Sequence, residues 1–286
     1  MIYTPPTLRK DLYSSCMEAL DDIGWDYGFS FSSYGVQLGL RVTDVDLLEL
    51  LRDHQPFASD YSDAKIVDRL FSVVAMGNVP SKGARYNLYW DQSLFAKKVP
   101  INELCTTFSS LTSLAVAELS EKKLFIHCGV VGWKDKAILI PGRTHVGKST
   151  LVHELVKAGA SYYSDEFAVL DNEGCISAYP RPLSMRQPLT RKQQDVPVEN
   201  IGGTIGHERL PVGLVILTEY KKKETWKPEN VSAGNGLLVL LDNTHSARRS
   251  PRRAMEILKL AVDDATILSG PRGNASETAR MILAEI

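Results

Sequence analysis

A glycine-rich segment between an apolar run and an amphipathic run limits what this chain can fold into more than any other feature. The segment consists of Gly142-Arg143-Thr144-His145-Val146-Gly147-Lys148-Ser149, followed by Thr150, and it satisfies the pattern G-x-x-x-x-G-K-[ST]. By chance, the fixed positions of that pattern are expected to match on the order of once in a hundred chains of this length. Residues 137–140 before it are apolar, and the apolar residues of 151–156 fall on one face of a helix. The sequence therefore predicts a strand, a phosphate-binding loop and a helix, in that order.

Each fixed position of the loop has a chemical reason. Gly142 and Gly147 allow backbone amides to curl around phosphate oxygens without a side chain in the way. A helix that begins near Lys148 directs its unpaired N–H groups and the positive end of its dipole at the same anion. We expect Lys148 to reach the β- and γ-phosphates of a nucleotide, and Ser149 to bind the accompanying magnesium ion. Residues 142–150 are thus predicted to hold a nucleotide such as ATP, with Mg²⁺.

The residues around the loop favour a mixed sheet over a doubly wound parallel sheet. Apolar runs predict strands at 124–131 and 137–140, before the loop. The acidic pair Asp165-Glu166 follows closely after the loop helix, which is predicted at 148–158. The strand after that pair turns back through a hairpin at 171–174. A strand–loop–helix unit of this kind, set on an antiparallel or mixed sheet, indicates a mixed α/β (α+β) fold.

The length of the chain suits two modules. With 286 residues, of which 44% are hydrophobic and 23% charged, it can bury a sizeable core. We expect a smaller N-terminal α+β module at residues 1–120 and the phosphate-loop domain at residues 121–286. In the first module, strands are predicted at 36–42, 70–75 and 86–90, and helices near 47–51 and 102–119. In the second, further strands are predicted at 212–217 and 236–241, and helices at 251–262 and 275–286, the last with Asn274 as its cap.

Charge and cysteine content exclude several classes of protein. The 33 basic and 34 acidic residues nearly balance, so neither nucleic acid nor a membrane surface is an expected partner. The four cysteines are widely spaced without a C-x-x-C pair, which is typical of reduced thiols rather than of a disulfide scaffold or zinc ribbon. The sequence has no apolar run of membrane-spanning length and no signal peptide at its start. We therefore expect a cytoplasmic protein.

The chain resembles the HPr kinase family, whose catalytic domain has a phosphoenolpyruvate-carboxykinase-like nucleotide fold. The resemblance runs from Phe125-Ile126-His127-Cys128-Gly129-Val130-Val131 through the loop to Ser164-Asp165-Glu166, and continues more weakly over residues 180–184. In that family a histidine, the loop lysine and an acidic pair form the catalytic set. His127, Lys148 and Asp165-Glu166 stand at the matching spacings here. The N-terminal residues look more like the divergent kinases found beside peptide-modifying enzymes, including those that phosphorylate lasso precursor peptides.

The resemblance also implies a role for each member of this set. The second acid of the family pair is the usual proton acceptor and falls on Glu166, which leaves Asp165 beside Ser149 as the metal ligand. The family has two aspartates where this chain has Asp165-Glu166, so which acid is the base stays open. His127 is expected either to orient the acid or to neutralise charge on the γ-phosphate. Arg272, in a tight turn between glycines, is a further side chain that can reach a phosphate.

Together these features predict a phosphotransferase that uses ATP and Mg²⁺. The expected acceptor is a serine or threonine hydroxyl of a peptide or protein, including a ribosomal natural-product precursor. Two alternatives remain: a kinase of small metabolites, and a nucleotide-binding regulator that transfers no phosphate. The sequence leaves open the acceptor, the choice between ATP and GTP, a reverse reaction with inorganic phosphate, and a homo-oligomer.

Overall fold

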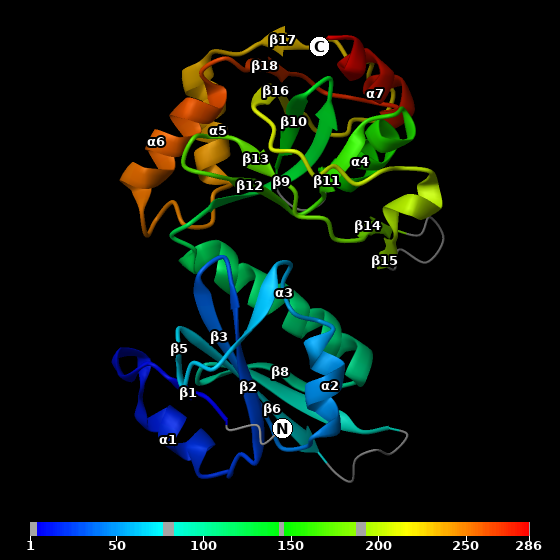
Figure 1. Cartoon of the computed structure of the whole chain (residues 1–286). Coiled ribbons are helices and arrows are strands. Elements are labelled where there is room, and N and C mark those ends of the chain that lie inside the picture. The colour runs from blue at the N-terminus through cyan, green and yellow to red at the C-terminus, as the bar shows by residue number, and fades with distance from the viewer. Residues whose placement is uncertain (1–4, 77–82, 143–145, 187–192, 286) are drawn as a thin grey trace. The chain divides into compact units, whose positions relative to one another are not determined.

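The structure is a computed structural model that describes residues 5–76, 83–142, 146–186 and 193–285 (Figure 1). Contacts within the chain divide it into two compact units, Met1–Glu121 and Lys122–Ile286. Both units combine helices with mixed sheets, so the chain has the mixed α/β fold that the sequence predicts. Among the helices in the described ranges, none has both the length and the apolar character that crossing a bilayer requires.

The sheet of the second unit has the strand order β13-β12-β9-β10-β16-β18-β17, with β11 also paired to β9. Its strands are β9 (Leu124–Trp133), β10 (Lys136–Pro141), β11 (Ser161–Ser164), β12 (Phe167–Leu170), β13 (Ile176–Ser177), β16 (Val212–Leu217), β17 (Glu229–Asn230) and β18 (Thr266–Ser269). Strands β10, β16 and β18 run parallel to one another, whereas β9 is antiparallel to β10, β11 and β12. The predicted mixed sheet is therefore confirmed.

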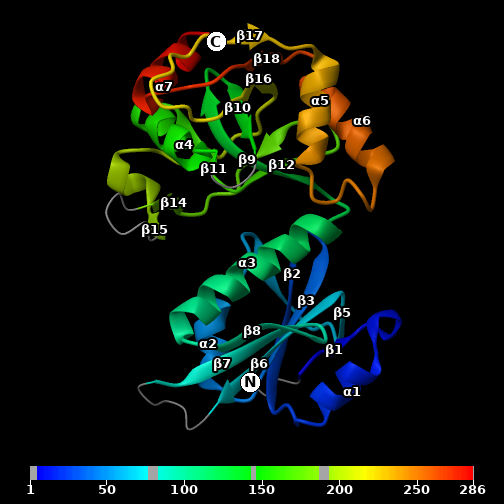
Figure 2. The same ribbon diagram turned by 180° about the vertical axis from the view of Figure 1, so that it is seen from behind.

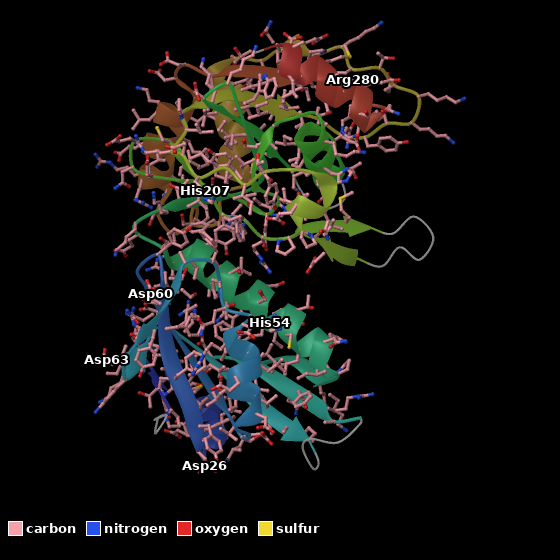
Figure 3. All side chains as sticks on the ribbon, turned by 45° about the vertical axis from the view of Figure 1, so that its right-hand side comes forward. Asp26, His54, Asp60, Asp63, His207 and Arg280 are labelled. Atoms are coloured by element: carbon pink, nitrogen blue, oxygen red, sulfur yellow. The ribbon has the colours of Figure 1, made fainter. Side chains whose placement is uncertain are left out.

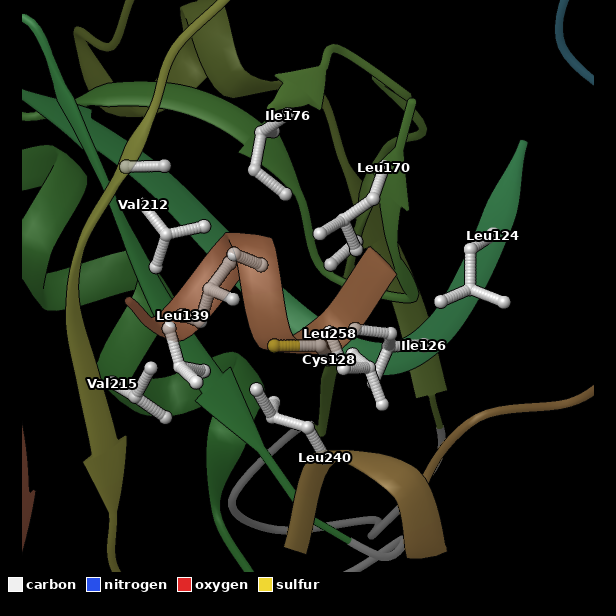
Figure 4. Close-up of a cluster of buried hydrophobic side chains, with 14 of the residues drawn as sticks. Leu124, Ile126, Cys128, Leu139, Leu170, Ile176, Val212, Val215, Leu240 and Leu258 are labelled. Atoms are coloured by element: carbon white, nitrogen blue, oxygen red, sulfur yellow. The ribbon is translucent and has the colours of Figure 1, made fainter. Parts of the chain in front are cut away.

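Helices cover both faces of this sheet, which explains why β10 is apolar after its first residue, the exposed Lys136. They are α4 (Lys148–Lys157), α5 (Ala233–Asp242), α6 (Pro251–Val262) and α7 (Ala275–Ala284). Leu139 of β10 packs in a cluster with α5 and α6, while Ile138 and Ile140 pack with α4 and α7 on the opposite face (Figure 1 and Figure 2). Figure 4 shows the first cluster, in which Leu258 of α6 lies near Cys128 of β9. The two layers of helices leave the carboxyl ends of the parallel strands for the phosphate loop.

The predicted strand at 236–241 is wrong, because these residues belong to helix α5. The Ser232 side chain caps the helix by accepting the N–H of Asn235 at 3.3 Å. The buried residues Gly236, Leu237 and Leu240 recur at the spacing of one helical turn. A short apolar run fits either a strand or one face of a helix, and here the serine cap and that spacing produce a helix. The Asn274 cap of α7 is confirmed, since its side chain accepts the N–H groups of Ser276 and Glu277.

The N-terminal unit contains a six-stranded sheet of order β4-β2-β3-β6-β7-β8. Helix α3 packs on β7 and β8 and buries one apolar face, and α2 packs on β3. The elements are α1 (Ser15–Asp21), β2 (Tyr27–Ser33), β3 (Val36–Val42), α2 (Asp46–Arg52), β4 (Ser59–Ser62), β6 (Arg69–Met76), β7 (Arg85–Trp90), β8 (Ser93–Val99) and α3 (Ile101–Leu119). The smaller elements of the chain are β1 (Thr7–Leu8), β5 (Ile66–Val67), β14 (Leu183–Arg186), β15 (Gln193–Val196) and the 3₁₀ turns Lys10–Leu12 and Val198–Ile201.

Candidate phosphate-binding site

Three loops meet at the carboxyl ends of the parallel strands, where ligands of open α/β sheets bind. The phosphate loop follows β10, while the loops that contain Tyr220 and Arg272 follow β16 and β18. The Tyr220 N–H donates to the carbonyl of Val146 at 3.3 Å. The Arg272 N–H donates to the carbonyl of Glu219 at 3.0 Å, and its own carbonyl accepts the N–H of Lys221 at 2.8 Å. Backbone hydrogen bonds therefore join the three loops into one surface around the start of α4.

The glycines of the loop adopt backbone angles that other residues rarely adopt. Gly142 has φ of 152° and Gly147 has φ of 89°, and Gly147 caps α4. A Cβ atom on Gly147 would lie 2.4 Å from Nη2 of Arg272, so a side chain there would displace the Arg272 guanidinium. The predicted binding residues Arg143, Thr144 and His145 lie outside the described residues. Val146 and Thr150 stand at the two ends of the described turn into α4, with Val146 half-buried and Thr150 exposed.

Lys148 projects back across the loop toward β9. It is 7% exposed, and its Nζ donates to the carbonyl of Gly142 at 2.6 Å. The same Nζ lies 3.1 Å from Nε2 of His127. A lysine ammonium can only donate, so Nε2 is the acceptor and the imidazole proton is assigned to Nδ1. The backbone carbonyl of Glu166 accepts a hydrogen bond from this imidazole. The sequence-predicted histidine and lysine are therefore in direct contact.

Burial and the neighbouring cation keep His127 neutral. The pKa of His127 is lowered to about 4, first by burial and then by the charge of Lys148 and the proximity of His245. A neutral imidazole adds no positive charge at neutral pH. This favours a role in orienting Lys148 over a role in neutralising a phosphate. Burial also lowers the pKa of Lys148, and the carboxylate of Asp165 opposes that effect.

The acidic pair lies in a break between two strands that both pair with β9. Tyr162 and Ser164 of β11 face the consecutive residues Val131 and Val130, which makes Tyr163 the extra residue of a bulge. After the break, β12 resumes with Phe167 opposite His127. The Ser164 hydroxyl accepts the N–H groups of Glu166 at 3.2 Å and Phe167 at 3.0 Å. The interruption frees the pair from the alternation of a continuous strand, so both acids can serve one site.

Asp165 is the acid nearer to the loop. The Ser149 hydroxyl hydrogen-bonds to its carboxylate, and Lys148 acts on it electrostatically. Burial raises the pKa of Asp165 to about 7, although Ser149 and Lys148 both lower it. Its Oδ1 is buried without a hydrogen-bond partner among the described residues. An orphaned buried carboxylate oxygen is costly, and a bound cation would satisfy it.

Glu166 has a different environment. Its Oε2 forms an ion pair with Nη1 of Arg181, and its side chain is 33% exposed. Burial raises the pKa of Glu166, whereas the charge and hydrogen bond of Arg181 lower it. The pairing favours the ionised carboxylate, which is the form that can accept a proton. The two acids are thus distinct: Asp165 faces Ser149, and Glu166 faces Arg181.

The residues around Asp165 fit a magnesium ion that is shared with a nucleotide. Among the described residues, no group of three or more His, Cys, Asp or Glu side chains could hold a metal by itself. Magnesium needs no such group, because it is usually bound by one or two protein oxygens together with water and substrate phosphates. The orphaned Oδ1 of Asp165 and the neighbouring Ser149 hydroxyl supply oxygens of this kind.

Three residues that the fold brings to the site had no role assigned from the sequence, although Ser164 and Arg181 lie within the resembling segments. Ser164 supports the break in the strand, and Arg181 pairs with Glu166. His245 lies in a segment whose backbone bonds to β9, and its ring centroid is 6.4 Å from that of His127. The Nε2 atom of His245 is buried without a partner among the described residues. No local pattern marks His245, because its position depends on pairing between distant segments.

No protein-family model matches the chain, and no curated protein matches it either. Among solved structures, the HPr(Ser) kinase/phosphatase from Coxiella burnetii is similar to it, with 14% sequence identity and a TM-score of 0.32. The similarity covers 56% of this chain and 91% of that chain. The geometry of the site, rather than this similarity, supports the function proposed below.

Proposed function

We propose that this chain is an ATP- and Mg²⁺-dependent kinase that transfers the γ-phosphate to a serine or threonine hydroxyl of a peptide or protein. One observation carries the proposal. The Lys148 ammonium, the Ser149 hydroxyl and the orphaned Oδ1 of Asp165 converge at the start of α4, beside a loop whose glycines have the backbone angles that phosphate cradles need. A lysine, a hydroxyl and a carboxylate are the groups that bind the terminal phosphates and their magnesium in kinases.

Lys148 and its neighbours prepare the site before a nucleotide binds. The Gly142 carbonyl and the neutral imidazole of His127 both accept from Nζ, at 2.6 Å and 3.1 Å. These two acceptors fix the direction of a long side chain that otherwise has many rotamers. The ammonium is thereby placed to stabilise charge that develops on the transferred phosphoryl group. His127 is therefore a positioning residue in this proposal.

Ser149 and Asp165 would hold the Mg²⁺ ion, which neutralises charge on the β- and γ-phosphate oxygens. When a cation is close, the Asp165 carboxyl is ionised in spite of its raised pKa, because the charged form is then favoured. Glu166 is the proposed base. The acceptor oxygen bonds to the γ-phosphorus, the bond from that phosphorus to the β–γ bridging oxygen breaks, and ADP leaves. The hydroxyl proton passes to the Glu166 carboxylate as the new bond forms.

The resemblance of the sequence to HPr kinases and to the kinases of lasso precursor peptides favours a peptide or protein acceptor. We would incubate the purified chain with Mg²⁺ and ATP or GTP, together with serine- and threonine-bearing peptides, precursor peptides or small hydroxy metabolites. The expected result is the mass gain of one phosphoryl group on a peptide. Phosphorylation of a metabolite alone would instead identify a small-metabolite kinase.

One variant tests the role of Glu166 as the base. Glu166→Gln should leave the affinity for Mg²⁺ and ATP nearly unchanged while it stops turnover, since the amide cannot take up the proton. Full activity in that variant would reject Glu166 as the base. The wild-type chain provides the broader test. Magnesium-dependent nucleotide affinity without transfer to any acceptor would indicate a regulator, and no such affinity at all would reject the proposed function.

A further inference from the structure

We propose that Arg272 is a positioning residue of the phosphate loop whose buried charge is balanced by the polyphosphate of the bound nucleotide. This inference rests on the proposed function, because it requires that the loop bind a nucleotide. Arg272 is 2% exposed, although it follows β18 and lies far from the loop in the sequence. Arg272 and Lys148 are both buried cationic side chains beside the loop.

The guanidinium is hydrogen-bonded to the backbone at the start of α4. Its Nη2 donates to the carbonyl of Gly147 at 2.7 Å, and its Nη1 donates to the carbonyl of Gly273 at 3.3 Å. The Gly147 carbonyl also accepts the N–H of Leu151 at 3.2 Å, as the first hydrogen bond of the helix. Holding this carbonyl fixes the peptide plane next to Lys148. The N–H of Lys148 belongs to the same rigid peptide unit, so this contact also fixes the direction of that N–H group.

Arg272 is itself held rigidly in place. A Cβ atom on Gly273 would lie 2.0 Å from the carbonyl oxygen of Glu224, so this turn packs directly against that backbone. The next residue, Asn274, caps helix α7. The backbone of Arg272 is also bonded on both sides to the loop after β16, through Glu219 and Lys221. A side chain anchored in this way can set the position of the loop rather than follow it.

The charge of Arg272 has no counter-ion within the described part of the chain. None of the ion pairs between described residues includes it, and its Nε is buried without a hydrogen-bond partner. Burial lowers its pKa, which shows the energetic cost of the charge in this position. The positive end of the α4 dipole and the buried ammonium of Lys148 lie at the same place. The carboxylate of Asp165 opposes the charge of Lys148.

An anion with several negative charges would balance this cluster of positive groups. A nucleoside triphosphate carries such charges on the phosphates nearest the loop, whereas a monophosphate carries fewer. Arg272 should therefore strengthen the binding of ATP more than that of ADP, and that of ADP more than that of AMP. A purely structural arginine would stabilise the fold without changing that distinction.

The test compares Arg272→Met, Arg272→Lys and the control Arg280→Met, whose arginine is exposed on α7 (Figure 3). Affinities for ATP, ADP and AMP are measured by calorimetry with Mg²⁺, and KM for ATP and kcat are measured where transfer occurs. We expect Arg272→Met to weaken ATP binding by about 10- to 100-fold, ADP less, and AMP least. Arg272→Lys should recover part of the loss, because it keeps the charge without the two-pronged hydrogen bonding. Arg280→Met should match the wild type.

The outcomes separate this inference from the proposed function. If the wild type binds no nucleotide with Mg²⁺, the proposed function fails and the role of Arg272 fails with it. If the wild type binds but Arg272→Met keeps the ATP-to-AMP affinity ratio, the positioning role alone is overturned. Should Arg272→Met not fold, Arg272→Lys decides. If Arg272→Lys keeps the wild-type ATP-to-AMP affinity ratio and the wild-type thermal shift on adding ATP, the inference is overturned.

Discussion

The two units of the chain bury charge in different ways. In the N-terminal unit, the buried Arg41 of β3 forms an ion pair with Asp21 and donates to the Ser72 hydroxyl at 2.8 Å. Its guanidinium carbon also lies 4.4 Å from the centre of the Trp25 ring. One nitrogen, Nη2, has no hydrogen-bond partner among the residues that the structure describes. The charge of Arg41 is nevertheless balanced from within the unit, by a carboxylate and an aromatic face.

In the second unit, the buried polar groups beside the loop are less completely satisfied. Asp165 Oδ1, His245 Nε2 and Arg272 Nε are all buried without hydrogen-bond partners among the described residues. Native interiors pair most such atoms, because an unpaired buried polar group costs free energy. The guanidinium carbon of Arg272 lies 5.8 Å from the centre of the Tyr220 ring, but among the described residues Arg272 has no carboxylate such as Arg41 has in Asp21. The first unit therefore pairs its buried arginine internally, whereas under the proposed function a nucleotide and a metal would complete the second unit. Each prediction below tests one side of this difference.

The largest expected effect is on catalysis in Lys148→Ala. Loss of a preorganised charged donor should lower kcat by on the order of 10²–10³. The fold should survive, since the change also removes a buried cation from a crowded positive site. Phosphoryl transfer is measured at saturating ATP, with Lys157→Ala as the control because that lysine is exposed on the same helix. Equal activity in the two variants would show that the loop lysine has no part in the chemistry.

The next largest effect is on how the unfolding free energy depends on pH in Asp165→Asn compared with the wild type. The pKa of Asp165 is about 7 in the folded chain, against a reference of 3.8. A raised pKa means that the neutral acid is favoured by folding, so this contribution is complete below about pH 4. It is lost as pH rises through about 7. Without metal, the unfolding free energy of Asp165→Asn relative to wild type should therefore rise by about 3 kcal/mol between pH 5 and 8.

With magnesium and ATP present, the wild type should become more stable than Asp165→Asn. Under the proposed function, the wild type would gain stability from a bound metal, and the variant would lack the carboxylate that holds it. Urea unfolding at several pH values, with and without Mg²⁺ and ATP, makes both comparisons. A wild type whose stability is independent of pH from 5 to 8 would mean that Asp165 is already satisfied within the chain.

A comparable change in the N-terminal unit should affect stability alone. Asp21→Ala leaves the buried Arg41 without its carboxylate and should cost about 2 kcal/mol, which is less than for a fully buried pair because Asp21 is 32% exposed. The variant should show no dependence on nucleotide and no change in kcat per folded molecule. Thermal melts and kinase assays test this, with the exposed Asp11 as the site of a control substitution to alanine. A fall in kcat at full folding would contradict the division between the two units.

The sequence was sufficient for the parts of the site that depend on local patterns. Strand β10, helix α4 and the parallel strand β16 lie where the residues predict them, because each is marked by apolar periodicity or by the flanking glycines. Strand β18 was missed, and α5 was mistaken for a strand, since short apolar runs do not specify their own conformation. Arg181 and His245 reach the site through pairing of distant strands and loops. That information is in the tertiary fold, so it cannot be read from spacing along the chain.

The smallest expected effect is that of Ser164→Ala, which tests the break between β11 and β12. The hydroxyl accepts two backbone N–H groups in a buried position, and its loss should cost about 1–2 kcal/mol of stability. The acidic pair would then be held less firmly. We expect a drop in kcat that is smaller than in Lys148→Ala, with KM for ATP nearly unchanged because the loop is untouched.

The control is Ser161→Ala, on the same strand but before the bulge. Unfolding free energies and steady-state rates are measured for both variants at one pH. If Ser164→Ala lost stability yet kept the wild-type kcat, the break would not be what positions the two carboxylates. If it lost kcat while Ser161→Ala did not, the bulge would be part of the catalytic geometry, because the substitution removes no group that contacts the nucleotide.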